Sequence, residues 1–162
     1  MILRLIKIML LAAVAAWALI GGLFNILLWG ETLGSVSAAT SMVTIEGGPE
    51  KWQAVSNPAL SWLGAVFIAG SKIAAGVLII RGILQMWGAR NEPAEAFAEA
   101  KKMAIAGCGV AMFMLFAGFI VIAETWFELW RSDVMLDPVL GSAFRYAGLI
   151  GVIAIFVGQS ND

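Results

Sequence analysis

The sequence has 162 residues, of which 61% are hydrophobic and only 13% are charged. A soluble domain is about half apolar and about a quarter charged, so this composition excludes an ordinary soluble domain and favours a membrane protein. The net charge of −1 gives nucleic acid no electrostatic attraction, and the absence of histidine removes the usual haem and copper ligands, the commonest zinc ligand and the commonest general base.

The first apolar segment predicts a transmembrane helix over residues 5–29. Arg4 and Lys7 lie at its start, and the small residues of AAVAAWA would suit cleavage of a signal peptide. The apolar run continues past that point through LIGGLFNILLW, which is long for a signal peptide. We therefore expect an uncleaved helix.

The second helix is expected over residues 58–87, after a longer loop. Residues 30–57 are polar and rich in Gly, Ser and Thr, which is typical of a loop outside the membrane. Asn57 can cap the helix that follows, and Pro58 suits the first helical position.

The third and fourth helices are expected over residues 93–130 and 138–158. Pro93 can begin the third, which meets no breaker before Trp130. Asp137 is expected to cap the fourth, with Pro138 at its first position. This last helix is roughly 31 Å long at 1.5 Å per residue, enough to cross a membrane. The sequence therefore predicts an all-α membrane protein, a single domain over residues 1–162 built as a four-transmembrane-helix bundle.

The basic residues predict the orientation. Those on the side of the termini outnumber those on the opposite side by six to three: Arg4, Lys7, Arg81, Arg90, Lys101 and Lys102 against Lys51, Arg131 and Arg145. Both termini are therefore expected in the cytoplasm, with the long first loop on the outer side of the membrane. An interfacial aromatic belt is expected from Trp29, Trp52, Trp62, Trp126 and Trp130 on the outer side and Trp87 on the inner side.

Polar side chains within the spans are the candidate site residues. Glu124 near the outer end of the third helix and Arg145 in the fourth should lie at similar depth, because antiparallel neighbours are joined by a short loop. Asn25 lies at a comparable level, and Glu128 is one turn further out. We expect a polar cluster of these four residues around an Arg–carboxylate pair. A structural tie between helices is the favoured interpretation. The two alternatives are a proton or ligand site, and contact of Glu124 with the lipid headgroups.

Lys72, in AGSKIAAG, falls near the middle of the second span, and no acidic residue is expected at the same depth. An ionisable residue inside a membrane is a candidate functional residue. Four environments remain open for it. Lys72 can extend toward the outer side, lose its charge, line a wet cavity, or contact a carboxylate of a partner protein.

ETWFELWRSD followed by GSAFRYAGLIGVIAIF resembles the bacterial family described as predicted small integral membrane proteins, the domain of unknown function two-one-six-five. FNILLWG, WQAVSNPAL and AFAEAKKMAIAG also resemble that family, so the resemblance covers most of the chain. The residues that match its characteristic segments are Glu124, Trp126, Phe127, Trp130, Ala143, Phe144 and Arg145. The resemblance implies four helices and no established activity. Because the family is bacterial, it also implies a bundle in the inner membrane with the long first loop in the periplasm. The chain departs from the family at Thr125, which separates the acidic residue from Trp-Phe, and at Lys72, where the family tends to carry a glutamate.

Two classes of function remain. The sequence contains no Gly-rich phosphate loop, nucleophile–base pair or metal-ligand cluster, so we expect neither an enzyme nor a bound cofactor or metal. The first class is an accessory subunit of a larger inner-membrane complex of respiratory or photosynthetic electron transport, with lipids and larger membrane subunits as partners. The alternative is a free-standing small transporter or channel that uses Lys72 and the cluster of Asn25, Glu124 and Arg145. Beside these two, a stress-response or lipid-binding protein that acts alone is a third. Lys72 facing outward would favour the first, and a path from Lys72 to a surface would favour the second.

Overall fold

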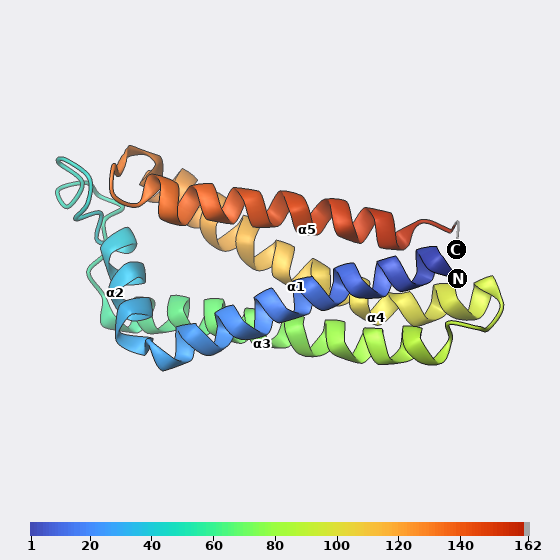
Figure 1. The fold of residues 1–162 in the computed structure, drawn as a ribbon. Helices are drawn as coiled ribbons and strands as arrows, with labels where there is room; N and C mark the ends of the chain where they lie inside the picture. The colour runs from blue at the N-terminus through green and yellow to red at the C-terminus, as the bar shows by residue number, and fades with distance from the viewer. Residues whose placement is uncertain (161–162) are drawn as a thin grey trace.

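The computed structural model describes residues 1–160 as a long bundle of helices (Figure 1). The elements in chain order are α1 (Ile2–Leu27), α2 (Trp29–Thr40), α3 (Pro58–Gly88), α4 (Ala94–Phe113), the π-helix η1 (Met114–Trp126), the short 3₁₀ turn η2 (Leu129–Arg131), the π-helix η3 (Leu136–Gly141) and α5 (Ser142–Gly158). Within this part of the chain, four segments are long and apolar enough to cross a membrane: Ile2–Leu27, Pro58–Gly88, Ala94–Trp126 and Leu136–Gly158. The predicted all-α, four-helix class is confirmed.

The bundle has two distinct ends (Figure 1). The start of α1, the α3–α4 connection and the end of α5 lie together at one end, here called the terminal end. The loop over residues 41–57, the turn over 127–135 and helix α2 lie at the other, here called the loop end. That the terminal end faces the cytoplasm stays a prediction from the basic residues.

The helix boundaries confirm one of the predicted helix starts and correct the other predicted ends. Asn57 caps α3 as predicted, since its side-chain oxygen accepts a hydrogen bond from the backbone N–H of Ala59 at 2.9 Å, with Pro58 in the first turn. The prediction that Asp137 caps the last helix is wrong, because that helix begins at Leu136 as η3, two residues earlier than expected, and has no side-chain cap. The third span ends at Trp126 instead of residue 130, and Glu128 in the following turn takes a left-handed conformation with φ 51°.

Helix α2 lies in the segment that was expected to be loop. The backbone breaks at Leu28, with φ −103° and ψ 47°, and a new helix starts at Trp29. Figure 1 shows α2 running across the end of the bundle instead of along it. It packs closely on α3, because a Cβ added at Gly64 would lie 2.7 Å from a Val36 methyl group.

Glycines bring α1, α3 and α4 into close contact. A Cβ added at Gly82 of α3 would lie 2.3 Å from the backbone nitrogen of Ala104 in α4. A Cβ at Gly76 would lie 2.5 Å from Leu19 of α1. In lipid, where no hydrophobic force draws helices together, such close approach is the main source of helix association.

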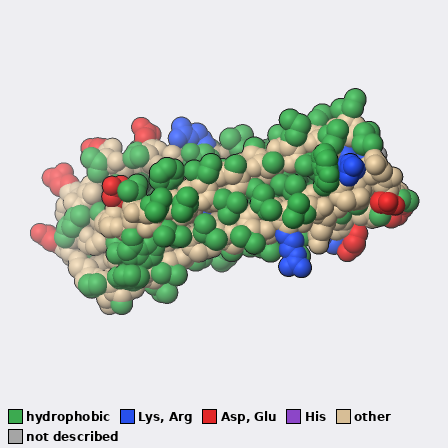
Figure 2. All heavy atoms as spheres, turned by 60° about the horizontal axis from the view of Figure 1, so that its bottom comes forward, with side chains coloured by type: hydrophobic (Ala, Val, Ile, Leu, Met, Phe, Trp, Pro, Cys, Tyr) green, Lys and Arg blue, Asp and Glu red, His purple; other side chains and the backbone are tan. Residues whose placement is uncertain are grey.

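The remaining surface suits a lipid environment. Exposed hydrophobic side chains cover the length of the bundle, and on the face shown in Figure 2 acidic side chains lie toward its two ends. The tryptophans predicted as an aromatic belt lie at these ends: Trp29 packs on Trp62 at 5.0 Å between ring centroids, and Trp52 on Trp126 at 5.3 Å. Trp130 is exposed at the loop end, whereas Trp87 lies at the terminal end under the guanidinium of Arg90.

Candidate functional site

A cavity of about 950 Å³ lies in the loop-end half of the bundle, bounded by α1, α2, α3, η1, η3 and α5. Helices α1 and α5 run close together at the terminal end and diverge toward the loop end (Figure 1), which leaves this space between them. The volume falls in the range of about 300–1,000 Å³ typical of small-molecule sites. On α3 the lining runs from Leu60 inward to Lys72, roughly 21 Å beyond Pro58 at 1.5 Å per residue. The cavity therefore reaches the middle of the membrane span.

Lys72 points into this cavity and toward α1. Its Nζ donates a hydrogen bond to Oδ1 of Asn25 at 2.8 Å and lies 5.8 Å from the centroid of the Trp17 ring. Gly21 makes room for it, since a Cβ there would lie 3.4 Å from Nζ. An ammonium carries three donors. Within residues 1–160 the structure gives it one acceptor and no carboxylate partner.

Asn25 connects Lys72 to the helix that crosses the loop end. Its Nδ2 donates to Oγ1 of Thr32 in α2 at 3.1 Å, and that hydroxyl donates to the backbone oxygen of Asn25, also at 3.1 Å. Thr32 is buried. Lys72, Asn25 and Thr32 thus form one chain of hydrogen bonds from mid-membrane to α2, and this chain fixes the position of the ammonium.

Two pairs of aromatic rings form part of the cavity wall. Trp17 packs on Tyr146 of α5 with 5.1 Å between ring centroids, and both line the cavity. Phe67 of α3 packs edge-on against Phe113 at the end of α4, with 6.3 Å between ring centroids. The walls are therefore mainly apolar and aromatic, and the few polar groups are concentrated at the Lys72 end and along α2.

The wall contributed by the third span is a π-helix. Phe127 N–H bonds to the carbonyl of Ile122 at 3.0 Å, and the hydroxyl of Thr125 bonds to the carbonyl of Ile120 at 2.8 Å, both five residues back. Backbone hydrogen bonding to the fifth residue is rare in proteins and is frequent at functional sites. Small η1 residues, among them Gly118 and Ala123, line the cavity and keep it open.

The four residues expected to form one polar cluster are not brought together. Asn25 bonds to Lys72 instead of Arg145. Arg145 is exposed and donates to its neighbour Ser142 at 3.1 Å. Glu124 is half-buried, and no ion pair joins it to Arg145 among the described residues. The expectation assumed 3.6 residues per turn, and a π-helix over residues 114–126 turns the side chains to other faces.

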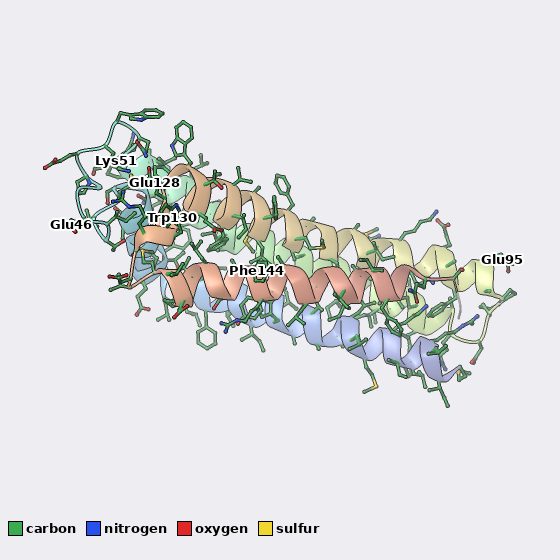
Figure 3. All side chains as sticks on the ribbon, turned by 90° about the horizontal axis from the view of Figure 1, so that it is seen from above. Glu46, Lys51, Glu95, Glu128, Trp130 and Phe144 are labelled. Carbon is green, nitrogen blue, oxygen red and sulfur yellow. The ribbon has the colours of Figure 1, made fainter. Side chains whose placement is uncertain are left out.

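Glu128 instead holds the first loop onto the end of the third span. Its carboxylate accepts from Lys51 at 2.5 Å, from Arg131 at 2.9 Å and from Gln53 at 3.0 Å. Figure 3 shows Lys51 and Glu128 together at the loop end, far from Glu95 at the other end. We call this set of four side chains the loop clasp. It lies beyond the membrane-spanning segments and so in reach of water.

The loop clasp is expected to open in acid. The hydrogen bonds from Lys51 and from Arg131 hold the pKa of the Glu128 carboxyl below its ordinary value of 4.5. A carboxyl whose pKa is lower in the folded state stabilises that state above its unfolded pKa and loses this contribution as the pH falls through the lowered value. We expect hydrogen-exchange protection factors of residues 41–57 to fall below pH 4.5. Glu128→Gln should show the weaker protection already at pH 7, whereas Glu50→Gln, at an exposed position in the same loop, should behave as wild type. A pH-independent loop in wild type would contradict this.

Sequence reasoning identified Lys72 as a candidate residue but did not identify the side chains that surround it. Trp17 lies in the middle of the first span, away from the interface where membrane tryptophans usually lie, and that position is the sequence signal of its location beside the ammonium. Nothing local indicated Tyr146 or the α2 lining, because both depend on how the helices are arranged. Among residues 1–160 no group of three or more His, Cys, Asp or Glu side chains could hold a metal ion.

Comparison with known proteins gives a family and no activity. The chain matches neither a curated protein nor a solved structure. A family model described as predicted small integral membrane protein, DUF2165, matches residues 3–160, nearly the whole chain. The match agrees with the apolar spans and with the resemblance found in the ETWFELWRSD and GSAFRYAGLI segments. The chain therefore belongs to the DUF2165 family of predicted small integral membrane proteins.

Proposed function

We propose that this protein binds a lipid-derived amphiphile inside its own bundle, as a free-standing binding or transport protein of the bacterial inner membrane. The observation that carries the proposal is that Lys72 points into a cavity of about 950 Å³. In this function the protein acts by binding and not by catalysis. Its terminal end faces the cytoplasm, so the cavity lies in the outer half of the membrane.

The energetic argument starts from the charge. A lysine at the centre of a membrane helix costs about 2.5–3.5 kcal/mol on insertion scales. In this chain the charge has a single neutral acceptor, Asn25, so most of that cost is not offset within the described residues. A ligand with hydrogen-bond acceptors would offset it. Mainly apolar walls with a few placed polar groups are also what small-molecule sites have in general.

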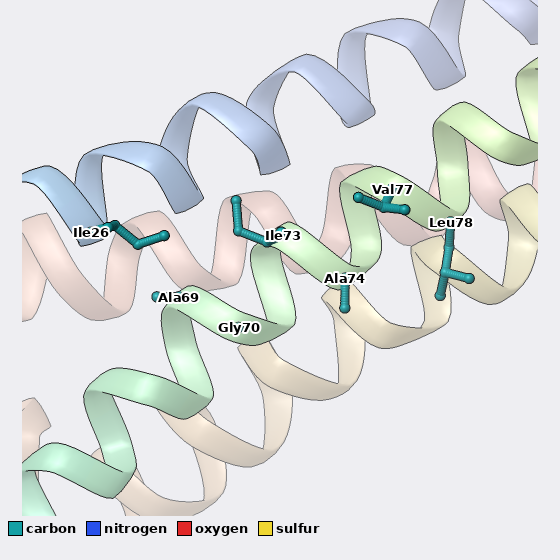
Figure 4. Close-up of a pocket in the computed structure, with 7 residues that line it drawn as sticks. All are labelled: Ile26, Ala69, Gly70, Ile73, Ala74, Val77 and Leu78. Atoms are coloured by element: carbon teal, nitrogen blue, oxygen red, sulfur yellow. The ribbon is translucent and has the colours of Figure 1, made fainter.

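A second candidate is the accessory-subunit role in a respiratory or photosynthetic complex. An apolar groove of about 580 Å³ on the outside of α1 and α3 favours it (Figure 4). Small residues, Ala69, Gly70 and Ala74, form much of its floor. They would let a helix of a larger membrane subunit approach closely.

One purification tests both functions. The protein would be solubilised from native membranes in mild detergent, and both its protein partners and its extracted small molecules identified by mass spectrometry. We expect a stoichiometric amphiphile that is absent from Ala123→Trp, which fills the cavity. Gly148→Trp, on the open outer face of α5, is the control and should retain the amphiphile. A fixed set of membrane subunits without an amphiphile would support the accessory role. If the protein is purified with neither an amphiphile nor partner subunits, both functions are contradicted.

A further inference from the structure

Two charged side chains line the cavity within residues 1–160, and they lie at different levels. Glu31 belongs to the first turn of α2 at the loop end and is exposed. Lys72 is the innermost lining residue on α3. The cavity is therefore basic at its inner end and acidic near its outer end. We infer from this polarity, and on the basis of the proposed function, that the ligand is a single-chain amphiphile with an anionic headgroup, a long-chain carboxylate, bound with its head against Lys72.

The position of the ammonium supports this orientation. One of its three donors is held by Asn25, which is itself held by Thr32, so the group is fixed before any ligand arrives. The Trp17 ring lies at 5.8 Å and leaves the cavity side of the ammonium for an acceptor. Hydrogen bonds between an ammonium and a carboxylate are shorter and about twice as strong as neutral ones. A cationic or zwitterionic head would place positive charge against Lys72.

The apolar lining of the cavity indicates that the rest of the ligand is a hydrocarbon chain. From Lys72 outward they are lined by side chains such as Phe24, Phe67, Ile68 and Val36, which offer a hydrocarbon chain apolar contact along the whole path. The path runs roughly 18 Å from the depth of Lys72 to that of Leu60, the outermost α3 residue of the lining, at 1.5 Å per residue, a distance suited to one extended chain. The tail then leads toward the loop end and the head lies in mid-membrane, the reverse of an ordinary lipid in that leaflet.

The test compares probes that share one chain and differ in the head. Radiolabelled hexadecanoate, hexadecanol and hexadecyl phosphate would be bound to the purified full chain in detergent. We expect hexadecanoate to bind about 10- to 100-fold more tightly than hexadecanol, the range that one to two charge-assisted hydrogen bonds supply. Lys72→Met should remove this preference while hexadecanol still binds, and Lys72→Arg should retain it. Tighter binding of hexadecyl phosphate than of hexadecanoate would support the same anionic chemistry and would indicate a phosphate lipid in place of a carboxylate.

The outcomes separate the inference from the proposed function. If hexadecanoate and hexadecanol bind wild type equally, and Ala123→Trp removes both, the cavity binds amphiphiles but the anionic head is wrong. If no probe binds wild type, the proposed function fails and the inference fails with it. The comparison of heads on wild type needs no variant to fold, so an unstable Lys72→Met protein cannot hide the answer.

Discussion

Substituting Gly82 by valine is expected to prevent α3 and α4 from packing. A Cβ at this position would lie 2.3 Å from the backbone nitrogen of Ala104 and 2.6 Å from its Cβ. A flexible side chain could move aside, but here the obstacle is backbone, so relief requires the two helices to separate. Overpacking a well-packed core costs about 1–3 kcal/mol, and a clash with backbone belongs at or above the upper end of that range. Thermal unfolding in detergent, followed by circular dichroism, measures the loss.

Gly70→Val supplies the matched control for this experiment. Gly70 is in the same helix, and a Cβ there would meet nothing within 4 Å. The same change of residue and of helix propensity is therefore made without a clash. We expect Gly70→Val to melt close to wild type and Gly82→Val to melt far below it or to aggregate. Equal melting of the two variants would show that α3 and α4 are not in the close contact described above.

The parts of the fold that sequence reasoning predicted are those fixed by nearby residues. The second span was expected over 58–87 and is Pro58–Gly88. Its start could be predicted because the cap at Asn57 and the proline at Pro58 act within the first turn and depend on no distant contact. The apolar length of each span likewise depends only on the residues within it. Helix α2 was missed, since its composition is that of a loop and it is held by contacts with α3, such as Val36 against Gly64.

The candidate site was predicted in part. Lys72 and Asn25 were both singled out, Lys72 was expected deeper than Asn25 with no acidic residue at its own depth, and its extension toward the outer side was one of four environments left open. A lysine has a four-carbon stem, and here it extends from α3 to α1 at the level of Asn25. The Glu124–Arg145 pair failed for a different reason, since the third span changes to π geometry at Met114. Glu128 bonds to Lys51, 77 residues earlier, and no local pattern specifies that contact.

The second large effect concerns Asn25, which we expect to matter more for stability than Lys72 does. Asn25→Leu removes the one acceptor of the ammonium and leaves a charge in an apolar site, which costs about 2–3 kcal/mol or more. Lys72→Met removes the charge itself and should cost about 1 kcal/mol, because it leaves only a neutral amide oxygen without a partner. The double variant should therefore be more stable than Asn25→Leu alone. Free energies of unfolding in mixed micelles measure the cycle, and Thr32→Val corrects for the hydrogen bond that Asn25 also makes with Thr32.

The stability of the double variant relative to the single variants shows whether Lys72 serves folding or binding. If the double variant regains most of the lost stability, the charge is not needed for folding, and this result supports a role for it in binding. If Lys72→Met alone lowers the free energy of unfolding as much as Asn25→Leu does, the pair is a structural tie between α1 and α3. The main argument that the cavity is a binding site would then be contradicted. Additive effects would contradict the 2.8 Å hydrogen bond itself, since two side chains in direct contact are expected to couple by about 0.5–3 kcal/mol.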